Sequence, residues 1–159
     1  MANAQEPSFD YQVKAAMVYK FLGYSTWPSN RFKDLNSPYR IWVMGSDEIT
    51  DELREIVSQR LINGRSIEIY SANAVDQIGD AHLVFVSHSM EPLLPKLCAL
   101  AKKNSFLIVT ENEKELAKGS TINLRMVDKR IGFDVSLTNA QDYGVSLSSR
   151  LLAIAVSVK

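Results

Sequence analysis

The chain has 159 residues with 18 Lys and Arg against 18 Asp and Glu. This balance gives no electrostatic indication of binding to nucleic acid or an anionic membrane, which depends on clustered Lys and Arg, and so disfavours both partners. Hydrophobic residues make up 46% of the chain, enough for a core without disulfide or metal staples. The only cysteine, Cys98, can form neither an intrachain disulfide nor a cysteine-based zinc site. No run approaches the ~20 apolar residues of a membrane span. Composition therefore predicts a soluble globular protein.

The N-terminus carries a weak indication of export. We expect residues 1–9 to form a tail and residues 10–159 to form one domain. Ala2-Asn3-Ala4 matches the small-x-small pattern that precedes a signal-peptidase cut, but neither a basic nor an apolar segment stands before it. The match is either the remnant of a cleaved signal peptide or a chance occurrence, and the pattern alone leaves both open.

The first two-thirds of the chain alternates helical and strand patterns. Residues 9–22 carry apolar side chains at helical spacing, with Gly23 placed to end the helix and Trp27-Pro28 to prevent its continuation. A second helix is predicted after Gly45-Ser46, with an inward stripe that ends at Leu61. A third opens at Ser89 and runs past Cys98. Compact apolar runs predict strands at residues 40–44, 67–70, 82–86 and 106–109.

The pattern then changes to strict alternation. Residues 122–126 and 131–135 each place apolar side chains at every second position, and Asp128-Lys129 lies between them, which predicts an antiparallel hairpin. Thr138-x-x-Gln141 predicts a capped short helix, and Ser148 or Ser149 a cap for a closing helix. The predicted fold class is α/β, with a mostly parallel sheet, helices on both faces and an antiparallel hairpin at one edge.

No catalytic centre is predicted. Ser87-His88-Ser89 follows the third strand, but it lacks the Gly-x-Ser-x-Gly elbow, and adjacent side chains of an extended segment do not point into one site. The favoured interpretation makes Ser89 a helix cap and His88 an exposed loop residue; a ligand contact by His88 is the alternative. With two histidines and no carboxylate at ligand spacing, we expect no metal and no cofactor.

The turn after the first strand is a poor nucleotide site. Residues 45–48 lack the glycine spacing of a phosphate-binding loop, and Asp47 and Glu48 would repel an anion at the helix N-terminus. The favoured interpretation is an acidic turn that stabilises its own helix dipole.

Three further features have both a structural and a functional interpretation. Cys98 lies on the inward stripe of its helix and is best explained as a small core residue, the alternative being a redox role assisted by Lys102. Arg130 belongs to a basic hairpin cluster that is either solvated or a carboxylate-binding site. The aromatic group of Phe21, Tyr24 and Trp27 favours packing at the end of the first helix over a ligand box.

Ordered blocks along the chain resemble the YfiR family of small periplasmic regulators from about residue 11 to residue 155. The opening helix at residues 14–21 (KAAMVYKF) is similar to the family's signature start, and Trp27-Pro28 to the pair that follows it. The strands at 41–45, 82–87 and 106–110 resemble its sheet strands, residues 131–136 its Phe-acid-x-Asn strand with Ser136 in place of Asn, and residues 145–155 its closing Ile-Ser-Ser-Lys-Leu-Leu segment. The order and spacing of these blocks carry the resemblance.

The resemblance implies a periplasmic, non-enzymatic regulator. Such proteins bind the periplasmic part of an inner-membrane diguanylate cyclase and restrain it, and an outer-membrane lipoprotein can sequester them, which raises cyclic di-GMP and biofilm formation. Export agrees with Ala2-Asn3-Ala4, and a homodimer is expected. The best-known member uses two intrachain disulfides, which this chain cannot form because Cys98 stands alone.

Two functional hypotheses follow. The first is inhibition of a membrane-bound cyclase, with Phe21, Tyr24 and Trp27 as the contact surface. The second is a small-molecule sensor that binds an apolar or zwitterionic ligand at the carboxyl ends of the strands, with His88 and Arg130 as contacts, and reports to a membrane kinase or receptor. An enzyme is disfavoured for want of a paired acid and base.

Overall fold

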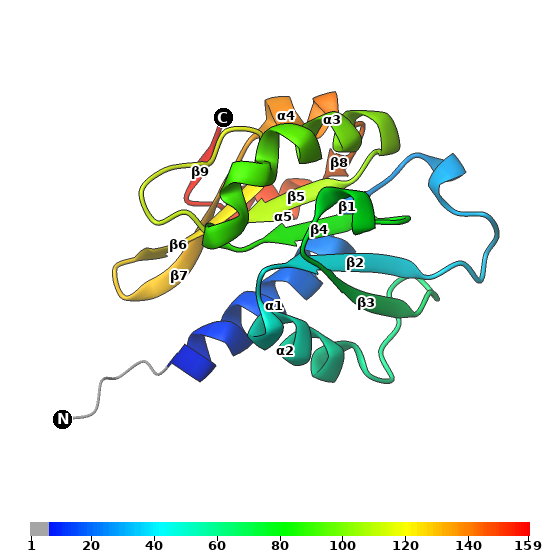
Figure 1. Ribbon diagram of the computed structural model, residues 1–159, viewed down its shortest axis with the longest axis horizontal. Helices are drawn as coiled ribbons and strands as arrows, with labels where there is room; N and C mark the ends of the chain where they lie inside the picture. The colour runs from blue at the N-terminus through cyan, green and yellow to red at the C-terminus, as the bar shows by residue number, and fades with distance from the viewer. Residues whose placement is uncertain (1–6) are drawn as a thin grey trace.

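A seven-stranded sheet runs through the centre of the molecule (Figure 1). The computed structural model describes residues 7–159, so the Ala2-Asn3-Ala4 prediction lies outside the described residues. The strand order is β3-β2-β4-β5-β6-β7-β9, parallel from β3 to β6, antiparallel between β6 and β7, and parallel again between β7 and β9. The strands are β2 (Tyr39–Met44), β3 (Ile67–Ala72), β4 (Leu83–Val86), β5 (Leu107–Thr110), β6 (Ile122–Val127), β7 (Arg130–Val135) and β9 (Ser157–Val158). A separate antiparallel pair joins β1 (Ser25–Thr26) to β8 (Ser146–Leu147).

Helices cover both faces of the sheet, which confirms the predicted fold class (Figure 1). One face carries α1 (Pro7–Gly23) and α2 (Asp47–Val57), and the other carries α3 (Leu94–Asn104) with α4 (Leu137–Asp142) beside it. The remaining helices are α5 (Ser149–Ile154) and the 3-10 segments η1 (Ser29–Arg31), η2 (Val75–Gln77) and η3 (His88–Leu93). Because α1 begins at Pro7, residues 7–9 of the predicted tail are helical.

The sheet separates two hydrophobic cores. Alternate residues of β4 point to opposite faces, so Leu83 and Phe85 pack with α1 and α2, whereas Val84 and Val86 pack with α3. The same division holds in β5, where Leu107 and Val109 pack with α1 and α2 and Ile108 packs with α3. Both strands are buried along their whole length, which is why they read as continuous apolar runs in the sequence.

The structure differs from the sequence prediction around the end of α2 and the start of α3. Helix α2 ends at Val57, and Gln59 then adopts a positive φ of 62°, so the predicted inward residue Leu61 is exposed and Ile62 is buried instead. Ser89 does not cap α3, because η3 occupies residues 88–93 and α3 begins only at Leu94.

Hydrogen bonds identify the N-terminal caps of the last two helices, α4 and α5. The cap of α4 is Ser136, two residues before the predicted Thr138, and its hydroxyl accepts a hydrogen bond from Asn139 N at 3.1 Å. For α5 the cap is Ser148, one of the two predicted residues, with Leu151 N donating to its hydroxyl at 3.3 Å.

A buried histidine joins the loop after α1 to the start of the sheet. His82 is stacked on Phe32 with ring centroids 4.6 Å apart, and the edges of Trp27 and Tyr39 enclose it at 5.6 Å. Its Nδ1 accepts a hydrogen bond from Arg40 N at 3.0 Å. Burial, with the nearby Arg31 guanidinium adding to it, lowers the pKa of His82 to about 4. The fold therefore requires neutral His82 at this position.

We expect His82 to make stability fall in mildly acidic solution. The pKa of His82 is about 4 in the folded chain against 6.5 when unfolded, so the unfolded chain takes up the proton first as the pH falls. The stabilisation is complete above pH 6.5 and is lost as the pH falls towards about 4, by about 3 kcal/mol in all. Chemical unfolding measured across this range tests the expectation. His82→Asn is the control because its amide oxygen can still accept from Arg40 N–H but does not titrate, and parallel pH profiles for the two proteins would contradict it.

Candidate functional site

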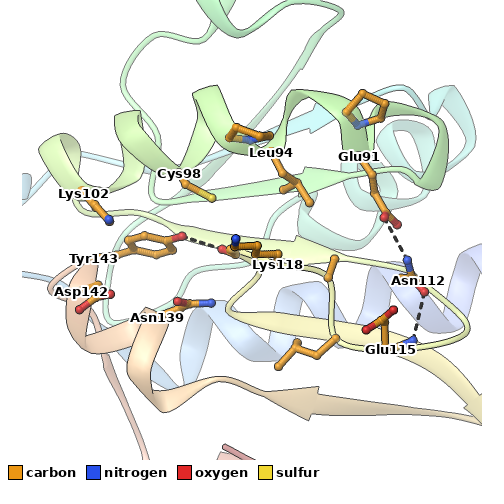
Figure 2. Close-up of a pocket in the computed structure, with 15 residues that line it drawn as sticks. Glu91, Leu94, Cys98, Lys102, Asn112, Glu115, Lys118, Asn139, Asp142 and Tyr143 are labelled. Atoms are coloured by element: carbon orange, nitrogen blue, oxygen red, sulfur yellow. Dashed lines mark hydrogen bonds between the residues drawn. The ribbon is translucent and has the colours of Figure 1, made fainter.

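A pocket of about 720 Å³ opens between α3, the 111–121 loop that joins β5 to β6, and α4 (Figure 2). It runs along α3, from Glu91 and Asn112 near the carboxyl ends of β4 and β5 to Lys102 and Tyr143 near the start of β5. Its first end lies on the side of a parallel sheet on which α/β proteins usually bind ligands. Its volume is typical of a small-molecule site. Its lining residues include Glu91, Leu94, Cys98, Lys102, Asn112, Glu115, Leu116, Lys118, Gly119, Asn139, Asp142 and Tyr143.

The inner wall of the pocket is built by three residues that are far apart in the sequence. The Tyr143 hydroxyl donates a hydrogen bond to Gly119 O at 2.6 Å, and the side chain of Cys98 lies against the same glycine (Figure 2). Gly119 has a φ of 92°, and the Cys98 sulfur occupies the space that a side chain at Gly119 would need. Burial, together with the contact to Cys98, raises the pKa of Tyr143, so the phenol stays protonated and acts as a donor.

The mouth of the pocket carries charges of both signs. Lys102 and Asp142 lie at one end, Glu91 and Glu115 lie at the other, and Lys118 lies between them (Figure 2). A rim that offers both ammonium and carboxylate groups can pair with both ends of a zwitterion. An anion without a positive group would meet uncompensated carboxylates instead.

The predicted contact His88 lies just outside this pocket, in a polar network. His88 is exposed, as the favoured interpretation expected, and its Nδ1 lies 3.1 Å from Glu91 Oε2. Glu91 Oε1 in turn accepts a hydrogen bond from Asn112 Nδ2 at 3.0 Å. The backbone N–H of His88 donates to Glu111, which also forms a largely buried ion pair with Lys14 at 2.7 Å. The network fixes η3 and the 111–121 loop relative to α1.

The predicted aromatic contact group is mostly internal. Phe21 and Trp27 are 2% and 5% exposed and belong to the core, and Trp27 also donates from Nε1 to His82 O at 2.9 Å. Burial leaves these two residues no surface to offer a partner in this conformation. Tyr24 is half-buried and is the only member of the group that reaches the surface.

The predicted basic cluster on the hairpin comprises Arg125, Asp128, Lys129 and Arg130, and its two arginines have different surroundings. Arg125 forms a two-point ion pair with Asp134, at 2.6 and 3.2 Å, and the bonded carboxylate has a lowered pKa because of this pair. Arg130 is exposed at the start of β7. Arg130 does not line the pocket by Tyr143, and it does not line a second hollow that lies between His88, Lys14 and Glu113. The structure therefore does not bring the two predicted ligand contacts, His88 and Arg130, together.

Sequence reasoning did not identify Tyr143, Gly119 or Asn139 as residues of a site. Tyr143 and its hydrogen-bond partner are separated by 24 positions and meet only because α4 packs against the loop before β6. The one local signal was Cys98, whose place on the inward face of α3 was predicted correctly; it packs against the core and also lines the pocket.

Two kinds of feature are absent from residues 7–159. None of the described helices is both long enough and apolar enough to cross a membrane. In the same part of the chain, no cluster of His, Cys, Asp and Glu side chains could hold a metal ion.

The fold and pocket define an α/β protein with a ligand-sized hollow between α3 and the 111–121 loop. The chain belongs to the YfiR/HmsC-like family, whose sequence model matches residues 11–156. The match confirms the family resemblance seen in the sequence. This is a family of periplasmic, non-catalytic regulators of signalling.

The fold also resembles a solved structure, that of a conserved domain protein from Vibrio cholerae O1 biovar El Tor strain N16961. The TM-score is 0.60 at 10% identity, and the match covers 94% of this chain but only 60% of the other. At this identity the likeness concerns the fold alone. No curated protein matches the chain.

The wall of the pocket should be intolerant of a side chain at Gly119. Gly119→Ala would combine a positive φ with overlap on Cys98, so we expect it to lower the free energy of unfolding by about 2–4 kcal/mol. Gly64→Ala is the matched control, because Gly64 has a φ of 78° and no heavy atom within 4 Å of the added carbon. Denaturant unfolding measures both variants, and Cys98→Ala should reduce the cost at Gly119. Equal costs at the two glycines would show that Cys98 does not close this wall.

Proposed function

We propose that this protein inhibits an inner-membrane diguanylate cyclase by binding the enzyme's periplasmic part, and so lowers cyclic di-GMP and biofilm formation. Membership of a family of periplasmic regulators supports the proposal. An outer-membrane lipoprotein that competes for the same surface would release the cyclase. The observation that carries the protein-binding role is an exposed apolar surface at the C-terminal end of the described chain.

That surface, called here the C-terminal surface, consists of Ile154, Val156 and Val158, which are 64%, 46% and 41% exposed. The segment is held firmly against the sheet, because Val156 N donates to Phe133 O at 2.7 Å and β9 pairs with β7. Exposed apolar side chains that are grouped on a fixed backbone favour contact with another protein, since little conformational entropy is lost on binding.

The surface is also braced from its polar side. Ser157 lies between the two valines, and its hydroxyl donates to Asp134 Oδ1 at 2.7 Å. Asp134 is the partner of Arg125, so the ion pair on the hairpin holds the C-terminal segment in place. The hairpin cluster would thus support partner binding by positioning this segment.

We expect deletion of the gene to raise cellular cyclic di-GMP and surface attachment. Complementation with the native gene should restore the low level, whereas I154D/V158D should not, because two carboxylates would be desolvated against an apolar partner. Leu35→Asp is the matched control, since Leu35 is an exposed apolar residue outside the C-terminal surface. The measurement is cyclic di-GMP per cell, with immunoblots to confirm equal protein levels.

Two outcomes would contradict the proposal. Unchanged cyclic di-GMP in the deletion strain would exclude a role in restraining a cyclase. Full complementation by I154D/V158D would place the contact elsewhere on the molecule.

The pocket favours a second candidate function, that of a small-molecule sensor. A ligand between α3 and the 111–121 loop would touch Glu91 and thereby the network around His88. In a thermal-shift screen of amino acids, nucleotides and vitamins, a true ligand at 100 times its Kd should add ~2.7 kcal/mol of stability. Leu116→Trp would fill the pocket and should abolish the shift. A complete absence of shifts, or a shift that survives this substitution, would count against the sensor.

A further inference from the structure

Strand β3 exposes an unpaired edge of the sheet. Tyr39 N donates to Ser66 O at 2.9 Å, and the register pairs Tyr39 with Ile67. In a parallel ladder this hydrogen bond means that the N–H and C=O groups of residues 66, 68 and 70 point towards β2. Those of residues 67, 69 and 71 point outward, away from the sheet. Within residues 7–159, no strand pairs with the outer side of β3.

This edge lacks the devices that usually prevent association. The six residues of β3 contain neither proline nor lysine, and their register with β2 is continuous, without a bulge. The one charged residue, Glu68, is engaged on the face away from α2, where Arg40 donates to it at 3.1 Å and the Tyr70 hydroxyl at 2.6 Å. The contact that an incoming strand would displace is the hydrogen bond from Arg54 Nη2 to Ile69 O.

The charges beside the edge have opposite signs at its two ends. At the Ile67 end, a hollow of about 610 Å³ is lined by Arg54, Arg60 and Leu61 and by no acidic residue. At the Ser71 end, a hollow of about 300 Å³ is lined by Asp47 and Glu48 and by no basic residue. The two hollows lie at opposite ends of α2, which thus presents a basic and an acidic end beside one edge.

We propose that the outer edge of β3 binds the β3 edge of a second copy of this chain, antiparallel about a two-fold axis at Ile69. This register places Ile67 opposite Ser71 of the second copy, so that residues 67, 69 and 71 all fall in hydrogen-bonded pairs. It also places the basic end of each α2 opposite the acidic end of the other. A two-fold interface requires such self-complementary charge, and this property favours a second copy over an unrelated strand.

Arg54 is already placed for this role. Its Nη2 donates to Ile69 O at 3.3 Å, which holds the guanidinium beside the outward-facing backbone. In the dimer it would turn to Asp47 of the second copy, and the Ile69 carbonyl would accept from the incoming strand. The inference is independent of the cyclase proposal, because it uses neither the C-terminal surface nor the pocket.

The test is the mass of the full chain in solution, measured by sedimentation equilibrium from micromolar to millimolar concentration. We expect a monomer–dimer equilibrium for the native chain. Asp47→Arg and Arg54→Asp should each weaken the dimer at least about tenfold, because like charges then face each other. The double variant D47R/R54D should restore it. The double variant carries both substitutions, so any loss of stability caused by either one is still present in it. Restoration of the dimer would therefore come from the restored pairing of opposite charges across the interface.

The backbone pairing is tested separately. Ser71→Pro removes an outward N–H from an exposed residue and should abolish the dimer, whereas Ser71→Thr keeps the N–H and should preserve it. Hydrogen exchange should show that the amides of residues 67, 69 and 71 gain protection as the chain concentration rises. Any one of three results would overturn the inference: a native chain that stays monomeric, a dimer that survives Ser71→Pro, or single charge reversals that leave the dimer unchanged. If the Ser71→Pro variant does not fold, the charge-reversal variants decide the question.

Discussion

The structure depends on the complete burial of the two central strands. Strands β4 and β5 have no polar face, so both sides of the sheet must be covered at this point. Helices α1 and α2 cover one side and α3 the other, and each therefore has a fixed place relative to the carboxyl ends of the strands. The pocket lies where α3 passes over the 111–121 loop, so its position follows from the need to bury the strands.

The same constraint explains what could be predicted from the sequence. The central strands were found because a strand buried on both faces is a continuous apolar run, and the hairpin because residues 122–126 and 131–135 alternate strictly. Leu61 was misplaced because helical periodicity was extended past Val57, where the chain leaves the helix. Ser89 and Thr138 were plausible caps by residue type, but the backbone begins its helices at other positions.

The candidate site could be predicted only in part. His88 was placed correctly as an exposed residue beyond β4, yet the pocket wall of Tyr143, Gly119 and Cys98 depends on contacts between distant segments, which no local pattern encodes. The aromatic group at the end of α1 is a reasonable surface by composition, but Trp27 packs around His82 and is therefore internal. The apolar residues around residue 156 stand out only in the structure, through their exposed side chains. Their sequence pattern does not distinguish them from the apolar residues of the closing helix.

Pocket, C-terminal surface and β3 edge are separate parts of the molecule, so ligand, partner and self-association can be tested one at a time. The proposed role of the chain is to bind a membrane-bound cyclase. The most direct measurement is capture from solubilised inner membranes with the native chain as bait and I154D/V158D as the matched bait. We expect the native chain to recover a diguanylate cyclase and the variant to lose it. Recovery of no cyclase, or equal recovery by both baits, would contradict it.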